Sequence, residues 1–525
     1  DGFQEYVYND GSDVGTPVMN SFCLDLSVSV EAYYEISTDV LVVGNNNKYS
    51  AYIYVTHAGE PASGVTITVD GTLLEGVTDE KGRIALPESY LDDAAIMQVV
   101  AEDDNGNVSF ATTAFSRVPA GEGNGPLFVS AKANENSQTE QNISWLANPL
   151  NTVQKALIKY MTVADYEANG NSFEGVEAVE GTSQLLDIGE SNNAADNSAV
   201  LVNSIELGGL KRNTEYVYIV GDGTVWSEVH YFSTTIKGGN TDFFVLGDTQ
   251  AENAGNVEAI AQAIGSSGKD YSFGIQTGDF IDSASSYAQW AEILNVFSSN
   301  FSNVDMVQVL GNHEYAGDLD GNIAATINML LDADYYSVTY GNVYVAVINY
   351  CGGEELQNAL AWLVEDAKSS DAIWKVLTLH QPPYYTNPTG GNESINKYVP
   401  IAVDEAGIDV VFSGHDHAYA RTLPMTGGKV DEENGAVYYI SGSTGEKSYD
   451  VIPDPGYNFA VATNDYTAIY ISVEATDETM TITTYNLGGT GVEIFDTYTI
   501  RKNNACTQNG HSYVYDGEYI LCTEC

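Results

Sequence analysis

Residues 241–250 read TDFFVLGDTQ, a short apolar run followed at once by a glycine and an aspartate. The run from Phe243 to Leu246 has the length and composition of a buried strand. Further apolar runs with polar residues close behind them lie at 271–276, 304–310, 376–379 and 410–412. Helical periodicity alternates with these runs, as in 354–368, where Leu356, Leu360 and Leu363 share one face. The sequence therefore predicts an α/β domain with parallel strand pairs.

Side chains that bind metals or protons stand at the end of every run. They are Asp248, Gln250, Asp279, Asn312, His313, His380, His415 and His417. Since ligands bind where parallel strands deliver their carboxyl ends, we expect these side chains to meet at one place. The chain has only 7 histidines, and four of them fall here, which is hard to explain as packing. The sequence thus predicts a functional site.

The chemistry of these donors indicates the ligand. Carboxylates, an amide and imidazoles together suit borderline divalent ions such as Zn, Mn or Fe rather than Ca or a thiolate site. The set also holds more donors than one tetrahedral ion needs. Two ions that share a bridging carboxylate fit this set better.

The ordered blocks GDTQ, GDFID, GNHE, LH and GHDH, which start at residues 247, 278, 311, 379 and 414, resemble the calcineurin-like metallophosphoesterase superfamily. The likeness to purple acid phosphatase-like proteins is closer still, because YYSVTYGNV at 335–343 resembles one of their segments. The resemblance implies a four-layer α/β sandwich with two central sheets. It also implies an enzyme that hydrolyses phosphate monoesters or diesters of small molecules.

The resemblance further implies a role for each residue. Asp279 would bridge the two ions. Asp248 and His417 would complete a first site, while Asn312, His380 and His415 would complete a second site. A hydroxide held by the ions would attack phosphorus. His313 would donate a proton to the leaving group or bind the phosphate. Asn312 would also bind the phosphate.

Asp282 and Gln250 depart from the family pattern, and the roles of Gln250 and Tyr384 stay open. Purple acid phosphatases carry a tyrosine where Asp282 stands, so we expect no ferric-tyrosinate centre and no purple colour. Gln250 stands where the superfamily usually has a histidine ligand; it could bind metal through its carbonyl oxygen, bond to a metal-bound water, or do neither. Tyr384 could touch substrate or serve in packing.

Charge restricts the partners. The chain holds 73 Asp plus Glu against 19 Lys plus Arg, a formal net charge of -54. Such a surface repels nucleic acid and anionic lipid, and no apolar run reaches the ~18 residues of a membrane span. The chain starts at Asp1 without an apolar leader, so we interpret it as a mature or trimmed product. We expect a secreted or cell-surface protein; the sequence does not indicate its oligomeric state.

Changes in composition and in hydrophobic periodicity along the chain predict four parts. Residues 1–118 are β-rich and resemble the Ig-like modules that bacteria string along secreted proteins. Residues 119–237 resemble a fibronectin type III domain, with a corner at 207–216 that Tyr216 would tie down. Residues 238–500 form the phosphoesterase domain, and 501–525 form a tail.

The tail contains Cys506, His511, Cys522 and Cys525. Four such donors suffice for a small structural zinc knuckle, and a disulfide with one cysteine left over is the alternative. A second reading of the whole chain also stays open. In it the metallophosphoesterase scaffold is catalytically weak and serves as a surface binding or adhesion protein.

Overall fold

The computed structural model describes residues 33–38, 52–87, 96–114, 125–147, 155–188, 198–250, 255–318, 320–387, 392–452, 456–488, 491–502, 513–515 and 520–522. Within these ranges the chain forms two compact units, one up to residue 114 and one from residue 125 onward. Each unit is described by itself.

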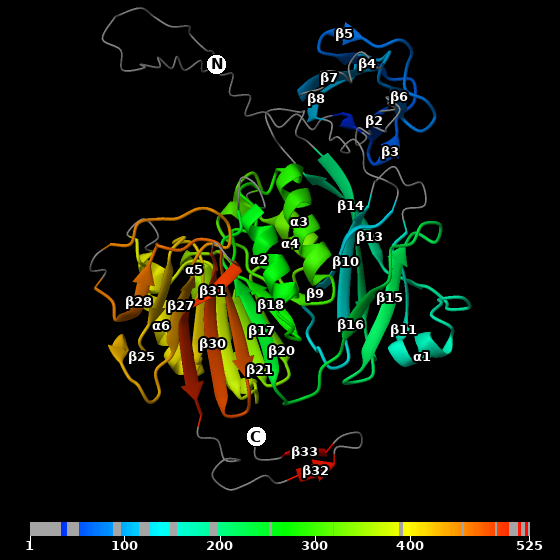
Figure 1. Ribbon diagram of the computed structural model, residues 1–525. Helices are drawn as coiled ribbons and strands as arrows, with labels where there is room; N and C mark the ends of the chain where they lie inside the picture. The colour runs from blue at the N-terminus through cyan, green and yellow to red at the C-terminus, as the bar shows by residue number, and fades with distance from the viewer. Residues whose placement is uncertain are drawn as a thin grey trace, which may run out of the picture. The chain divides into compact units, whose positions relative to one another are not determined.

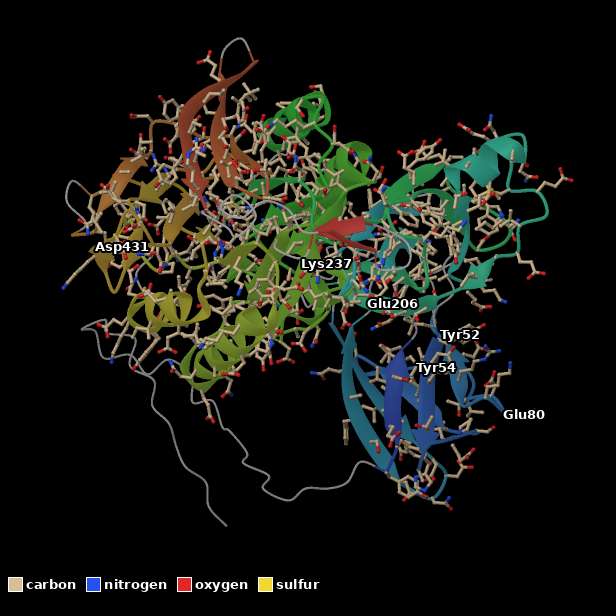
Figure 2. All side chains as sticks on the ribbon, turned by 90° about the horizontal axis from the view of Figure 1, so that it is seen from below. Tyr52, Tyr54, Glu80, Glu206, Lys237 and Asp431 are labelled. Carbon is tan, nitrogen blue, oxygen red and sulfur yellow. The ribbon has the colours of Figure 1, made fainter. Side chains whose placement is uncertain are left out.

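The first unit, in its described part, consists of two four-stranded antiparallel sheets. One holds β1 (Glu35–Thr38), β2 (Tyr52–His57), β3 (Glu60–Pro61) and β6 (Arg83–Ala85), and the other holds β4 (Thr66–Val69), β5 (Thr72–Leu73), β7 (Ile96–Glu102) and β8 (Val108–Ala114). Strand β2 alternates as a half-buried strand should. Ile53 and Val55 are buried, whereas Tyr52 and Tyr54 lie on the other face (Figure 2), their ring centroids 6.4 Å apart. The predicted β-rich N-terminal region is confirmed.

The second unit begins with a β-sandwich. Its strands are β9 (Leu127–Lys132), β10 (Gln141–Ala147), β11 (Leu157–Thr162), β12 (Val179–Glu180), β13 (Thr182–Ile188), β14 (Ser198–Leu207), β15 (Glu215–Gly221) and β16 (His230–Ser233), with the short helix α1 (Val163–Ala168) after β11. Ile143, Trp145 and Phe232 lie in its core. The amide of Lys211 donates to the hydroxyl oxygen of Tyr216 over 2.8 Å. The hydrogen bond expected at this corner is therefore present.

Two mixed sheets follow, and together they form the centre of the second unit. The larger sheet, in the described residues, runs β13-β14-β10-β9-β19-β18-β17-β29-β30-β31, and the smaller runs β20-β21-β22-β23-β27-β24-β28. The strands not yet given are β17 (Thr241–Leu246), β18 (Phe273–Gln276), β19 (Asp305–Gln308), β20 (Tyr335–Tyr340), β21 (Val343–Ile348), β22 (Trp374–Leu379), β23 (Val410–Ser413), β24 (Tyr419–Thr422), β27 (Val437–Ser441), β28 (Phe459–Thr463), β29 (Ile469–Ala475), β30 (Thr479–Gly488) and β31 (Gly491–Arg501). As predicted, β17, β18 and β19 pair in parallel, and so do β22 and β23. Strands β21 and β27, which were not part of that prediction, extend the parallel pairing on either side of β22 and β23.

Helices cover the outer faces of the two sheets (Figure 1). The larger sheet packs against α2 (Gly255–Gly265), α3 (Tyr287–Phe301) and α4 (Asn322–Asn328), and the smaller against α5 (Gly353–Ser369) and α6 (Glu393–Ala406). A third apolar core fills the space between the sheets, where Val245 and Ile275 meet Val376. The predicted four-layer α/β sandwich is therefore confirmed.

The β-sandwich and the central sheets share one continuous sheet. Met306 of β19 pairs with Lys132 of β9, in parallel. Next to this pair the buried carboxylate of Asp305 accepts hydrogen bonds from Gln141 and Asn134 of the sandwich, at 2.7 and 3.0 Å. Burial raises the pKa of Asp305 to about 7, since neutral donors compensate only part of the lost hydration. The two parts are thus joined by a ladder pair and a buried polar cluster.

Some expectations fall outside the described residues. The boundary near residue 118 lies within 115–124. Of the predicted zinc knuckle, Cys506, His511 and Cys525 are not described, and for Cys522 only the backbone of β33 (Ile520–Cys522), paired with β32 (Tyr513–Tyr515), is described. Among the described helices none combines the length and the apolar composition that crossing a bilayer requires.

Candidate metal centre

The ends of the parallel strands bring the predicted ligands together. Ligand atoms of Asp279, His380 and His415 lie within 4.8 Å of one another, and so do those of Asp248, Asp279 and His417. Asp279 belongs to both groups. The amide oxygen of Asn312 lies 3.2 Å from Nε2 of His380 and so joins the group of Asp279, His380 and His415. We call Asp248, Asp279 and His417 the first site, and Asp279, Asn312, His380 and His415 the second site.

The orientation of His380 is set by a backbone carbonyl. Nδ1 of His380 lies 3.0 Å from the carbonyl oxygen of Thr277, which can only accept, so Nδ1 carries the proton. Nε2 then faces the second site, 3.1 Å from Oδ2 of Asp279 and 3.1 Å from Nδ1 of His415. A backbone acceptor behind a metal-binding histidine fixes its tautomer in this way.

Glycines beside the ligands give the backbone room to approach. A Cβ at Gly278 would stand 2.6 Å from Nδ1 of His380, and a Cβ at Gly311 would stand 2.3 Å from Oδ1 of Asp279. At Gly414 it would stand 2.8 Å from Oδ2 of Asp248. The glycine that precedes the polar residues in these sequence blocks is therefore a steric requirement of the site.

Three residues of the two ligand groups have a left-handed backbone. The φ angles are 54° at Asp279, 72° at His415 and 48° at His417, in a region that residues with a Cβ rarely adopt. Such conformations cost on the order of 1–3 kcal/mol each and gather at functional sites. The packing of the sheets that carry these loops offsets the conformational cost.

The electrostatics of the site call for added positive charge. Asp248 is 0% exposed, and burial raises the pKa of its carboxyl to about 8. Burial also lowers the pKa of His415 to about 4 and that of His417 to about 3. Burial opposes the charge on His380 as well, yet Asp279 raises the pKa of His380 to about 9. Bound cations would stabilise the ionised form of the buried carboxylates, and His415 and His417 are already neutral donors, so the residues present fit two divalent ions.

Glu314 holds the loops of the two sites together. It is 0% exposed, and its carboxylate accepts from the amides of Asp279, Phe280 and Gly311 at 2.9, 2.7 and 2.6 Å. Burial raises the pKa of Glu314 to about 7. The residue orients the backbone that presents Asp279 and is not itself in either ligand group.

We expect Glu314→Gln to lower the free energy of unfolding by roughly 2–3 kcal/mol, because the new amide group would face buried N–H donors and leave at least one unpaired. Urea unfolding followed by tryptophan fluorescence measures the change. Glu365→Gln, on the exposed side of α5, is the matched control and should leave stability unchanged. A loss below about 0.5 kcal/mol in Glu314→Gln would contradict this account.

His313 lies at the rim of the centre and is 28% exposed in its side chain. Its Nδ1 bonds the carbonyl oxygen of Asp282 at 2.7 Å, and its Nε2 lies 3.9 Å from Oδ2 of Asp279. The backbone amide of His313 donates to Oδ1 of Asp279 over 3.0 Å. The imidazole is therefore held beside the carboxylate that the two ligand groups share, without belonging to either group.

Lys447 is a site residue that sequence reasoning missed. Its ammonium contacts Oδ1 of Asp282 at 2.8 Å, and two residues further on the ring of Tyr449 packs on His417 with centroids 4.6 Å apart. Both residues lie in the segment after β27, which is parallel to β23 and ends at the same edge of the sheet. The strand-end argument, applied to 437–441, would have found this segment.

The structure does not bring Tyr384 to the centre. The residue is 7% exposed and packs edge-on against the rings of Tyr438 and Tyr457, within the apolar core of the smaller sheet. This packing corresponds to the alternative that the sequence left open. Asp416, between the two ligand histidines, accepts from the amide and hydroxyl of Thr386 and is likewise outside both groups.

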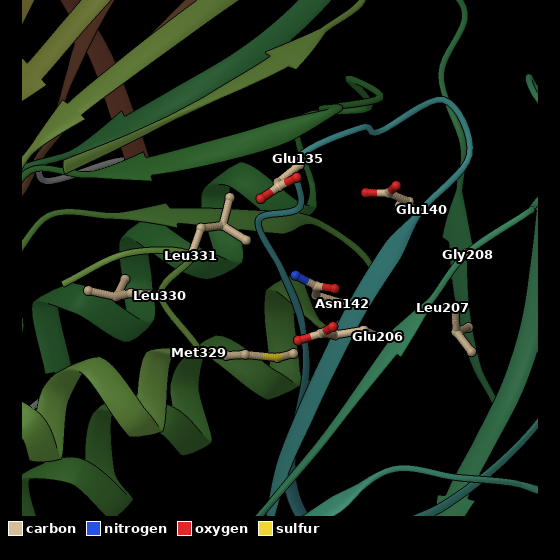
Figure 3. A pocket seen from close by; sticks show the side chains of 9 residues that line it. All are labelled: Glu135, Glu140, Asn142, Glu206, Leu207, Gly208, Met329, Leu330 and Leu331. Carbon is tan, nitrogen blue, oxygen red and sulfur yellow. The ribbon is translucent and has the colours of Figure 1, made fainter. Parts of the chain in front are cut away.

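A cavity of about 440 Å³ opens in another part of the second unit (Figure 3). Glu135, Glu140 and Glu206 of the β-sandwich line it together with Leu330 and Leu331. It contains none of the predicted site residues, so the ligand groups alone define the candidate site.

Comparison with known families agrees with this geometry. Residues 241–419 match the family described as calcineurin-like phosphoesterase, and residues 126–234 match the purple acid phosphatase N-terminal domain. The chain carries a metallophosphoesterase domain. The resemblance inferred from the sequence blocks is therefore confirmed, and so is the enzyme class. This family uses a dinuclear metal site, and the two ligand groups of this chain are candidates for such a site.

Individual relatives are distant. Purple acid phosphatase 17 of Arabidopsis thaliana is 23% identical over 248 residues, which cover 40% of this chain and 70% of that protein. Purple acid phosphatase 21 of the same plant is 30% identical over 119 residues, 22% of this chain and 27% of that protein. The solved structure of purple acid phosphatase PPD1 from yellow lupin (Lupinus luteus) seeds aligns with a TM-score of 0.61 at 15% identity, covering 90% of this chain and 96% of that chain. At such identity the structural likeness shows the fold alone.

Proposed function

We propose that this metallophosphoesterase hydrolyses phosphate monoesters or diesters of small molecules at a dinuclear centre of Mn, Zn or Fe ions. The observation that carries the proposal is the shared carboxylate of Asp279, which lies within 4.8 Å of ligand atoms of both sites. Two ions, when bound, supply the charge that holds the phosphoryl oxygens and activates the attacking water.

The chain's own residues support the rest of the reaction. Asn312 is half-buried, and the NH₂ group of its amide would donate to a phosphate oxygen. His313 has Nδ1 fixed by a backbone carbonyl, so its Nε2 is the atom that would carry a second proton toward the leaving group. The ammonium of Lys447 offsets the negative charge of Asp282 beside the centre, which lessens the repulsion of an anionic substrate on a chain of net charge -54.

We also propose that the protein acts outside the cell or at its surface. The strongly acidic composition and the additional β-rich first unit support this location. Detection of the protein on intact cells by an antibody, compared with lysed cells, tests it. Signal that needs lysis would contradict the proposal.

Removal of metal is the direct test of the function. Protein stripped with a chelator and then reloaded with Mn, Zn or Fe is assayed on a chromogenic phosphate monoester and on the matching diester. We expect turnover to vanish on stripping and to return with at least one metal, because the buried donors need the cation. The ratio of the two rates then assigns the substrate class.

The alternative function gives a different outcome in the same experiment. A catalytically weak scaffold would bind the metals and show no turnover with any of them on either ester. That result would overturn the proposed hydrolysis and favour a binding role. Turnover that survives complete stripping would overturn the dinuclear mechanism instead.

A further inference from the structure

Gln250 occupies a buried place beside the first site, two residues after Asp248. It is 3% exposed, and its backbone amide donates to the carbonyl oxygen of Asp279 over 3.3 Å. Its side-chain Nε2 lies 2.9 Å from Oδ1 of Asp282. Its side-chain oxygen Oε1 is buried and has no hydrogen-bond partner among the described residues.

The contact with Asp282 decides which way the amide of Gln250 faces. Oδ1 of Asp282 also accepts from Lys447 at 2.8 Å, and this ammonium lowers the pKa of the Asp282 carboxyl. An ionised carboxylate can only accept, so the atom of Gln250 that faces it must be the NH₂ group. Asp282 therefore fixes the amide and turns the carbonyl oxygen away from itself.

A buried amide oxygen without a partner costs about 1–3 kcal/mol, so its presence in the folded chain calls for an explanation. The nearby chemistry offers one, because Asp248, Asp279 and His417 supply three donors, fewer than the four of a tetrahedral ion. Amide oxygens are ordinary ligands for oxygen-preferring divalent ions.

We propose that Oε1 of Gln250 is a ligand of the metal ion in the first site, together with Asp248, Asp279 and His417, and that Asp282 and Lys447 are positioning residues for it. This inference rests on the proposed function and names one further donor of the same centre. Gln250 contributes no charge, and the charge of Asp282 is directed to Lys447 rather than to the ion. The first site therefore suits a divalent rather than a trivalent ion.

Metal binding, measured without reference to activity, tests the inference. Stripped protein is titrated with Zn in competition with a fluorescent indicator, and bound metal is counted by elemental analysis. We expect two ions per chain in the unchanged protein. Gln250→Met keeps the side-chain volume without the oxygen and should weaken one ion by at least about tenfold while the other keeps its Kd. The absorption spectrum of Co-loaded protein should change in the same variant.

Three further variants separate ligation from packing. Gln250→Ala should reproduce the weakened ion, Gln250→His should restore it because imidazole is also a donor, and Gln262→Ala on exposed α2 should behave as the unchanged protein. Wild-type Kd values for both ions in Gln250→Met and Gln250→Ala would overturn the inference. So would an equal loss in Met, Ala and His variants, since the position would then serve packing. An unchanged protein that binds no ions would overturn the proposed function itself.

Discussion

We expect Asp279→Asn to lower kcat/KM for any phosphate ester by roughly 10³-fold. Loss of a group that merely orients a metal ligand costs about 10–100-fold. Asp279 lies within reach of both sites, so weakening two ions at once multiplies the losses. The fold should survive, because the amide oxygen of asparagine can still accept the hydrogen bond from the backbone of His313.

The measurement pairs steady-state kinetics in saturating metal with a count of bound ions. Asp371→Asn is the matched control, since this carboxylate pairs with Lys237 on the exposed surface and should leave kcat/KM unchanged. Activity of Asp279→Asn within tenfold of the unchanged protein would show that Asp279 does not bridge the two sites.

His313→Ala should lower kcat by about 10²–10⁴-fold on a substrate whose leaving group needs a proton. An alkyl phosphate has such a leaving group, whereas the nitrophenolate of a nitrophenyl phosphate leaves as a stable anion without a proton. We therefore expect a much smaller loss on the nitrophenyl ester. Both ions should stay bound, because His313 is in neither ligand group.

The ratio between the two substrates separates the roles of His313. An equal loss of kcat on alkyl and nitrophenyl esters would contradict proton donation and indicate that the imidazole binds the phosphate. The conservative variant His313→Gln, which can donate a hydrogen bond but cannot transfer a proton at neutral pH, should rescue binding without restoring the alkyl ester reaction.

Most of the catalytic domain could be predicted because its signals are local. Each buried strand is an unbroken apolar run, as from Phe243 to Leu246, and the polar residue that ends it lies at a sheet edge by simple geometry. The face of α5 that holds Leu356, Leu360 and Leu363 is buried as the periodicity indicated. The gathering of ligands from separate strand ends followed from the parallel pairing alone.

The contacts around the ligands could not be predicted in the same way. The chain from Gln250 to Asp282 to Lys447 joins three loops whose separation in sequence carries no signal of contact. The burial of Tyr384 depends on rings contributed by Tyr438 and Tyr457, far along the chain. Strands β9 and β19 pair through a single pair of residues, and no sequence pattern in either strand predicts this pairing.

The pairing of β9 with β19 limits which β-sandwich domains could replace the one in this enzyme. A chimaera that took a foreign β-sandwich in place of residues 126–234 would have to supply equivalents of Asn134 and Gln141, or leave the Asp305 carboxylate buried without its donors. It would also expose the edge of β19 to pairing with other chains. The sandwich is thus joined to the catalytic domain by a shared sheet and a buried polar cluster, and it is not an exchangeable accessory.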